Sequence, residues 1–217
     1  MIEDERRLSQ IALSHGQARW VLRHFNMASA ETDASFNALL KSLRLAGIPF
    51  AADEVGGGTG HNVTYQFPHL MELALALAFR TQGILPRYFL SLIANNREKL
   101  RHFFQRAYLE RESGLGARLG LYEGPEFPGG TETHYDRAKA LTNISGTYLH
   151  FAMVDTRGGM QIPLEFRLIG PAEAVEIFMR GHMNIYPRPP IAISDIAVDI
   201  VKLATSDDIP EIRRGRQ

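Results

Sequence analysis

Four glycines occupy five positions between Gly56 and Gly60, in the stretch EVGGGTGHNVTYQF, and the first chemistry to consider there is phosphate binding. Glycine lets backbone N–H groups approach a phosphate because no Cβ stands in the way. A P-loop also needs a Lys after its last glycine, and a dinucleotide-binding loop needs a helix directly behind it. Here His61 and Asn62 follow Gly60, and an alternating stretch follows them. The pattern therefore argues against a nucleotide-binding loop.

The same stretch fits the tip of a β-hairpin better. Apolar and polar residues alternate from Asn62 to Phe67, which is typical of a half-buried strand, and IPFAADEV before the glycines is a second extended piece. A glycine-rich tip of this kind can lie close to the phosphates of a nucleic acid. His61, Asn62 and Thr64 would supply short hydrogen-bonding side chains beside it.

Two short helices are predicted ahead of this hairpin. Ser14 can cap the first, and apolar residues follow it at helical spacing up to Asn26. The second is predicted over residues 30–46 and ends at Gly47. One face of this second helix is apolar and its other surface is small, polar and basic. The apolar face consists of Phe36, Leu39, Leu40 and Leu43.

Helix, turn, helix and two-stranded wing in this order make a winged helix-turn-helix, whose second helix enters the major groove of DNA. The order therefore predicts double-stranded DNA as a partner. We expect the contact residues on both helices and on the wing. They are Arg19, Arg23, Ser35, Asn37, Lys41, Arg44, Thr59, His61, Asn62 and Thr64.

Two more helices are predicted after the wing. The first runs from Pro68 to Gly83, and the second from near Pro86 to about Glu112 with no internal Gly or Pro. The second is long for a globular domain. Its apolar positions, with Asn96 counted as a polar member, are alternately four and three residues apart, as in a short coiled coil. It either forms a dimerisation seam or packs against its own domain. The seam would consist of Phe89, Ile93, Asn96, Leu100, Phe103 and Ala107.

From Ser14 to about Tyr108 the chain resembles the DNA-binding part of the MerR family of bacterial transcription regulators. That family follows its wing with a Tyr, a Leu five residues later and a Gly thirteen residues after the Leu, and here Tyr65, Leu70 and Gly83 have this spacing. The resemblance implies a dimeric transcription regulator, with an antiparallel coil where the long helix is predicted. Two residues before the Tyr the family has an Arg that contacts the DNA backbone, and this chain has Val63.

Composition limits the alternatives. The 217 residues carry 24 basic and 24 acidic side chains, so any nucleic-acid site must be a local patch. Residues 80–118 hold eight basic against three acidic side chains, and their arginines extend the candidate phosphate contacts. There is no Cys, which excludes disulfides and thiolate metal sites. A charged N-terminus and the lack of a long apolar run predict a cytoplasmic protein without a membrane partner.

We expect an α+β fold with two domains. Residues 1–112 would form the winged helix-turn-helix with its dimerisation helix, and residues 119–217 a small α+β domain for a small-molecule effector or a protein partner. No motif predicts a cofactor, a metal site or catalysis. Two other functions stay open: a winged-helix protein-interaction module without DNA binding, and an enzyme. The enzyme would use histidines and carboxylates of the second domain, namely His134, His150, His182, Asp136, Asp155 and Glu165.

Overall fold

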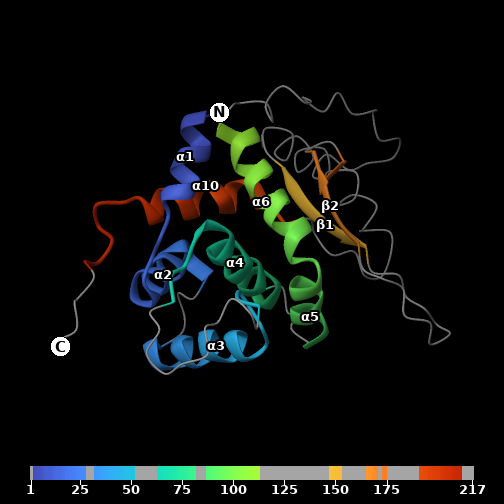
Figure 1. Ribbon diagram of the computed structural model, residues 1–217. Helices are drawn as coiled ribbons and strands as arrows, with labels where there is room; N and C mark the ends of the chain where they lie inside the picture. The colour runs from blue at the N-terminus through green and yellow to red at the C-terminus, as the bar shows by residue number, and fades with distance from the viewer. Residues whose placement is uncertain are drawn as a thin grey trace, which may run out of the picture. The chain divides into compact units, whose positions relative to one another are not determined.

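A computed structural model describes residues 2–27, 32–51, 63–81, 87–112, 147–152, 165–170, 173–174 and 191–211. These residues form an α+β fold in which helices predominate and the sheet is small (Figure 1). The elements are α1 Ile2–Gln10, α2 His15–Leu22, the π-helical turn η1 Arg23–Met27, α3 Asp33–Leu45, α4 Phe67–Thr81, α5 Arg87–Asn95, α6 Arg97–Glu112, β1 Tyr148–Ala152, β2 Glu165–Ile169 and α10 Ile193–Ala204.

The chain divides into two compact units. One consists of residues 1–105 and 196–217, and the other of residues 106–195. The C-terminal part of α10 thus belongs with the N-terminal unit, which the predicted boundary at 112–119 does not anticipate. Within the described residues, no helix combines the length and the apolar character needed to cross a membrane.

The two short helices predicted before Gly47 are present as α2 and α3, and local capping explains where they begin. Ser14 accepts a hydrogen bond from the Gln17 backbone N–H, and the Gln17 side chain accepts one from the Ser14 backbone N–H, which is a complete capping box. Thr32 caps α3 in the same way through the Ser35 N–H. Gly47, at φ +82°, ends α3 in the left-handed region, where a residue with a Cβ is disfavoured.

The core of the first unit is built around α4. Residues 70 to 79 of this helix are all buried, which is the pattern of a helix enclosed on every side. Within this unit, Figure 1 shows α4 between α2 and α3 on one side and α5 on the other. Phe36, Leu40 and Leu43 of α3 are buried as predicted, and Leu39 is half-buried.

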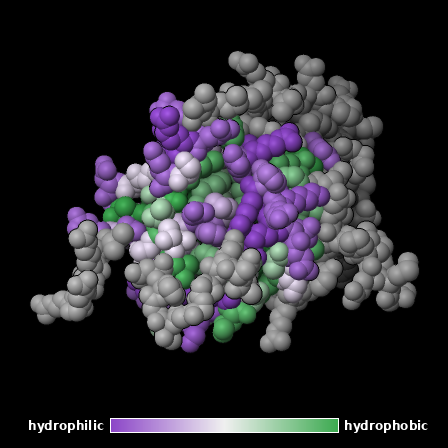
Figure 2. Space-filling view, viewed as in Figure 1, coloured by the Kyte–Doolittle hydropathy of each residue, from purple (hydrophilic) through white to green (hydrophobic). Residues whose placement is uncertain are grey.

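In the space-filling view, polar residues gather over α6 and apolar ones show between them (Figure 2).

Only part of the predicted wing falls within the described residues. Tyr65, in its second limb, forms an antiparallel bridge with Leu13, the residue just ahead of the α2 cap, through N–O distances of 2.8 and 2.7 Å. The described part of the first limb, residues 48–51, contains no strand, and Ile48 and Phe50 are buried there. The glycine-rich tip lies outside the described residues.

The single long helix predicted from Pro86 to Glu112 is wrong, because it is two helices that meet at Asn96. The Asn96 side-chain Nδ2 donates to the Leu92 carbonyl at 2.9 Å, and its backbone N–H is shared between the Leu92 and Ile93 carbonyls. An Asn side chain that binds nearby backbone groups competes with the helical hydrogen bonds. The helix is therefore interrupted at Asn96 although no Gly or Pro is present.

The predicted dimerisation seam is not a free surface either. Ile93, Leu100 and Ala107 are fully buried in the single chain, and Asn96 is engaged at the helix junction. Phe103 is half-buried beneath the Lys99 ammonium group, 5.6 Å from its ring centre, and the Phe89 side chain lies outside the described residues. Of the two explanations for the apolar spacing, packing against the chain's own residues accounts for the buried positions.

The second unit contains the strands. β1 and β2 pair antiparallel, with Phe151 opposite Phe166, and Leu149 of β1 also bridges Ile191. Tyr148, Ile169 and Ala174 form its buried apolar cluster. The buried Ser194 hydroxyl accepts from the Thr147 backbone N–H at 2.9 Å, so the start of α10 is joined to the residue before β1.

Candidate nucleic-acid interface

The predicted contact residues of α2 and α3 lie on two neighbouring helices of the first unit. Ser35, Lys41 and Arg44 are exposed on α3, as is Thr64 in the second limb of the wing, whereas Asn37, Arg19 and Arg23 are half-buried. Thr59, His61 and Asn62 lie outside the described residues. The structure thus brings the helical candidates together and leaves the wing tip undescribed.

Three of these candidates help to hold the two helices against each other. The Arg19 guanidinium donates through Nη1 to the Asn37 side-chain oxygen at 3.2 Å. Arg23 at the end of α2 forms an ion pair with Asp33, the first residue of α3. A carboxylate in the first helical turn is also favoured by the helix dipole. Arg19, Arg23 and Asn37 therefore fix the orientation of α3, and their groups are partly committed before any partner binds.

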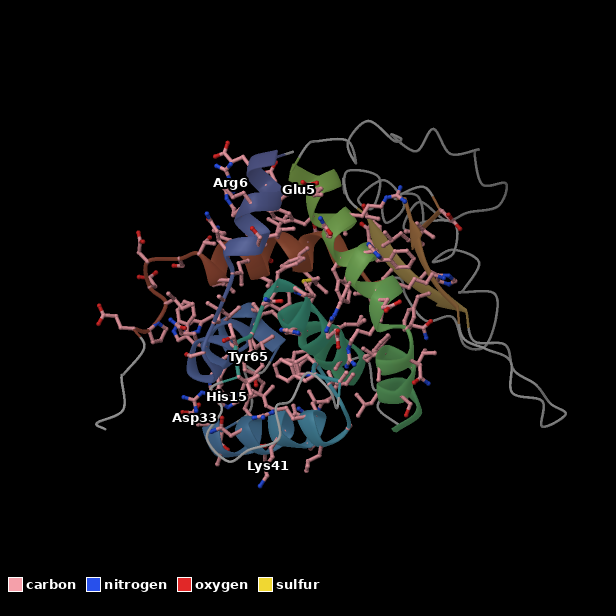
Figure 3. The ribbon with its side chains drawn as sticks, viewed as in Figure 1. Glu5, Arg6, His15, Asp33, Lys41 and Tyr65 are labelled. Atoms are coloured by element: carbon pink, nitrogen blue, oxygen red, sulfur yellow. The ribbon has the colours of Figure 1, made fainter. Side chains whose placement is uncertain are left out.

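Lys41 and Arg44 are different because neither has an acidic partner among the described residues. Both lie in the second half of α3, and Figure 3 shows Lys41 pointing outward from this helix. Two exposed cations without a carboxylate leave a positive surface for an external anion. Ser35 adds an exposed hydroxyl near the other end of the same helix.

Sequence reasoning missed His15 and the position of Tyr65 beside it. Tyr65 is only 2% exposed, its ring contacts Phe50 edge-on at 5.0 Å, and its hydroxyl lies 3.1 Å from His15 Nδ1. Figure 3 shows both side chains near the start of α2. They are fifty positions apart in the sequence, and the Leu13–Tyr65 bridge helps to bring them together. The alternation from Asn62 to Phe67, which marks Tyr65 as inward-facing, was the one available signal.

Burial and then nearby positive charge shift the pKa values of this pair. Partial burial of the imidazole lowers the pKa of His15, and the nearby charges of Arg44 and then Arg19 lower it further. Burial raises the pKa of Tyr65, and Arg44 acts against that rise. Arg44, Arg19 and both rings line the same small cavity. His15, Arg19 and Arg44 form one basic cluster, which we call the His15 cluster.

Two arginines counted among the candidate phosphate contacts have another role. Arg97 Nε lies 3.0 Å from both carboxylate oxygens of Glu72, and Arg101 Nε lies 3.1 Å from one of them. Glu72 is fully buried in α4, and its burial raises the pKa of the carboxyl, while the charges and hydrogen bonds of the two arginines act in the opposite direction. The prediction that arginines beyond Arg80 contact DNA is therefore wrong for Arg97 and Arg101.

The same cluster supports α3. Arg97 Nη2 also donates to the backbone carbonyl of Gly47, the residue that ends α3. One guanidinium group thus joins the end of α3 to the buried carboxylate in α4. Because a buried charge is stable only when it is paired and hydrogen-bonded, we treat Glu72, Arg97 and Arg101 as a structural cluster that positions the interface.

No described feature of this face suits an organic ligand or a metal ion. The cavity beside His15 and Tyr65 has a volume of only about 10 Å³, which is room for a single water molecule. Nowhere in the described ranges do three His, Asp or Glu side chains come together as a metal site requires. Of the second-domain histidines, His150 lies on β1, and His134 and His182 are outside the described residues.

Comparisons with protein-family models, with curated proteins and with solved structures find no match for this chain. The candidate interface is therefore defined by its own geometry alone.

Proposed function

We propose that this protein is a DNA-binding transcription regulator whose α2–α3 pair is a helix-turn-helix. The observation that carries the proposal is the exposed basic surface of α3, whose Lys41 and Arg44 have no acidic partner among the described residues. This helix is held by α2 on one side and by Arg97 at its end. An α-helix presented in this way fits the major groove, which is wide enough to admit one. Lys41 and Arg44 would contact phosphates or guanine edges, and Ser35 would contact either.

The Leu13–Tyr65 bridge supports a winged form of this motif. It ties the chain before α2 to the second limb of the glycine-tipped segment, so the wing would emerge beside the start of the first helix. Thr64, next to Tyr65, is exposed and would reach the DNA backbone. In this proposal Val63 at the family's Arg position removes one charged contact, so α3 carries more of the phosphate contacts.

Recognition of two half-sites would require a dimer, because each helix-turn-helix occupies one half-site. The homodimer stays part of the proposal, but its interface has to use residues other than the buried Ile93, Leu100 and Ala107. Residues 119–217 would then carry an effector or a protein contact.

A protein-interaction module is the second candidate, and Leu45 is the observation that favours it. Leu45 is the last residue of α3 and is 82% exposed, so a large apolar side chain stands next to the basic positions. Exposed apolar residues on a recognition surface are more typical of protein interfaces than of phosphate contacts. In that case Leu45→Gln would abolish partner binding, whereas it would leave DNA affinity nearly unchanged.

A gel-shift titration tests the proposal directly. Duplex fragments from the protein's own genomic locus are titrated with the chain at low salt, where phosphate contacts are strongest. We expect a discrete complex that resists excess unrelated duplex. Absence of any complex at low salt would eliminate DNA binding and favour the interaction module.

A further inference from the structure

His15 is the least expected member of the positive surface. It is the first residue of α2, directly after the Ser14 cap, and it remains exposed although its Nδ1 lies 3.1 Å from the buried Tyr65 hydroxyl. The groups that act on its imidazole are Arg19 of its own helix, Arg44 of α3 and the Tyr65 phenol. Within the part of the chain that the structure describes, no carboxylate is among them.

A histidine in such a cluster disfavours its own proton for a definite reason. The imidazole is partly buried, and protonation would place a third positive charge beside Arg44 and Arg19, with no carboxylate among the described residues to balance it. The pKa of His15 in the free protein is therefore lower than that of an ordinary histidine. A phosphate between these side chains would supply the missing negative charge.

The Tyr65 hydroxyl can form a hydrogen bond with His15 Nδ1 whether the imidazole is neutral or protonated. When His15 is neutral with Nδ1 unprotonated, the hydroxyl donates to that nitrogen, and when His15 is protonated the hydroxyl oxygen accepts from Nδ1–H. Gain of the proton therefore costs no hydrogen bond within the protein. Tyr65 itself is held in place by its backbone bridge to Leu13 and by the Phe50 ring.

We propose that His15, Arg19 and Arg44 form a site for one phosphate of the DNA backbone, and that His15 takes up a proton when the phosphate binds. This inference rests on the proposed function and adds a contact residue and a pH dependence to it. The bound phosphodiester and the imidazolium stabilise each other, so the duplex raises the proton affinity of His15. By linkage, a lower pH raises the affinity for the duplex.

The test measures duplex affinity by fluorescence anisotropy at fixed low salt between about pH 5.5 and pH 8, the range in which histidine titrates. The probe is a labelled duplex of two helical turns, about 21 base pairs. The variant is His15→Gln, which stays neutral and can still bind the Tyr65 hydroxyl. His102→Gln, at an exposed position of α6, is the matched control.

Wild type and His102→Gln are expected to bind more tightly as the pH falls, by up to about tenfold if the phosphate raises the pKa of His15 by one unit. His15→Gln should lose this gain, so that its affinity no longer rises as the pH falls through the range in which histidine titrates. Calorimetry in two buffers of different ionisation enthalpy should show proton uptake by wild type and less by His15→Gln. Thermal unfolding of each variant verifies that the fold is intact.

Two results would overturn the inference while the proposed function survives. One is an identical pH dependence of affinity in wild type and His15→Gln, and the other is tight duplex binding without proton uptake. If neither protein binds the duplex at any pH at low salt, the proposed function itself fails, and this inference fails with it.

Discussion

Between α4 and α6, Arg97 and Arg101 converge on the buried carboxylate of Glu72, whereas on α3 Arg44 and Lys41 are exposed with no carboxylate among the described residues to pair them. Both regions belong to the first unit and are rich in basic side chains. The Arg97 side chain is 12% exposed and fully engaged, while those of Lys41 and Arg44 are open to solvent. In the first region the positive side chains stabilise the fold, whereas in the second they remain available for a partner.

The difference shows what a count of basic residues leaves out. Residues 80–118 are the most basic segment of the chain, yet two of their arginines are committed to Glu72. The shorter α3 carries fewer cations, and its Lys41 and Arg44 have no acidic partner within the described ranges. The position of one buried acid therefore decides which basic residues remain for a partner.

The largest expected effect comes from removing that acid. Glu72→Gln keeps the shape of the side chain but leaves the guanidinium groups of Arg97 and Arg101 without a negative partner in a mostly buried site. Breaking a buried ion pair in this way costs about 3 to 5 kcal/mol of unfolding free energy. Urea denaturation measures it, with Glu98→Gln on the exposed surface of α6 as the control. An equal, small change in both variants would contradict a structural role for the cluster.

Gly47 ends α3 and binds Arg97, so it belongs to both regions. Its substitution should lower the free energy of unfolding by an intermediate amount. It adopts φ +82°, and its carbonyl accepts from Arg97, so a Cβ strains the residue that ends α3. Gly47→Ala is expected to cost about 1 to 2 kcal/mol, the penalty for a left-handed non-glycine residue. The control is Gly16→Ala on α2, where no atom lies within 4 Å of the added Cβ. That control should stabilise the fold by up to about 1 kcal/mol, since Ala favours helix. Equal effects at both positions would contradict this distinction.

Local signals predicted the helix ends well, because capping depends on neighbours in the sequence. Ser14 with Gln17 and Gly47 after α3 mark boundaries that the structure bears out. The break at Asn96 could not be predicted in this way. Asn, unlike Gly or Pro, interrupts a helix only when its side chain binds a nearby backbone group, and here the Asn96 side chain donates to the Leu92 carbonyl.

Contacts between distant residues could not be predicted in this way. Glu72 stands within an apolar run, and its partner Arg97 is twenty-five positions away, so nothing local distinguishes a buried acid there from an exposed one. The approach of His15 to Tyr65 depends in the same way on the bridge at Leu13. The exposed cations of the candidate site could thus be predicted from the sequence, whereas the Glu72–Arg97 and His15–Tyr65 contacts behind them could not.

The exposed cations should have the smallest effect on stability, since surface substitutions usually change it by less than about 0.5 kcal/mol. Their effect should appear in DNA binding instead. Lys41→Ala combined with Arg44→Ala is expected to weaken duplex binding at low salt. It should also make the plot of log affinity against log salt concentration less steep by about one for each lost phosphate contact. Lys202→Ala, at an exposed position of α10, is the control.

The salt dependence of duplex affinity in wild type, the double variant and this control is therefore the most direct test of a DNA-binding α3 surface. The account predicts a steep slope for wild type and Lys202→Ala and a shallower slope for the double variant, with all three proteins equally stable. Unchanged affinity and slope in the double variant, or no binding by wild type at low salt, would contradict it.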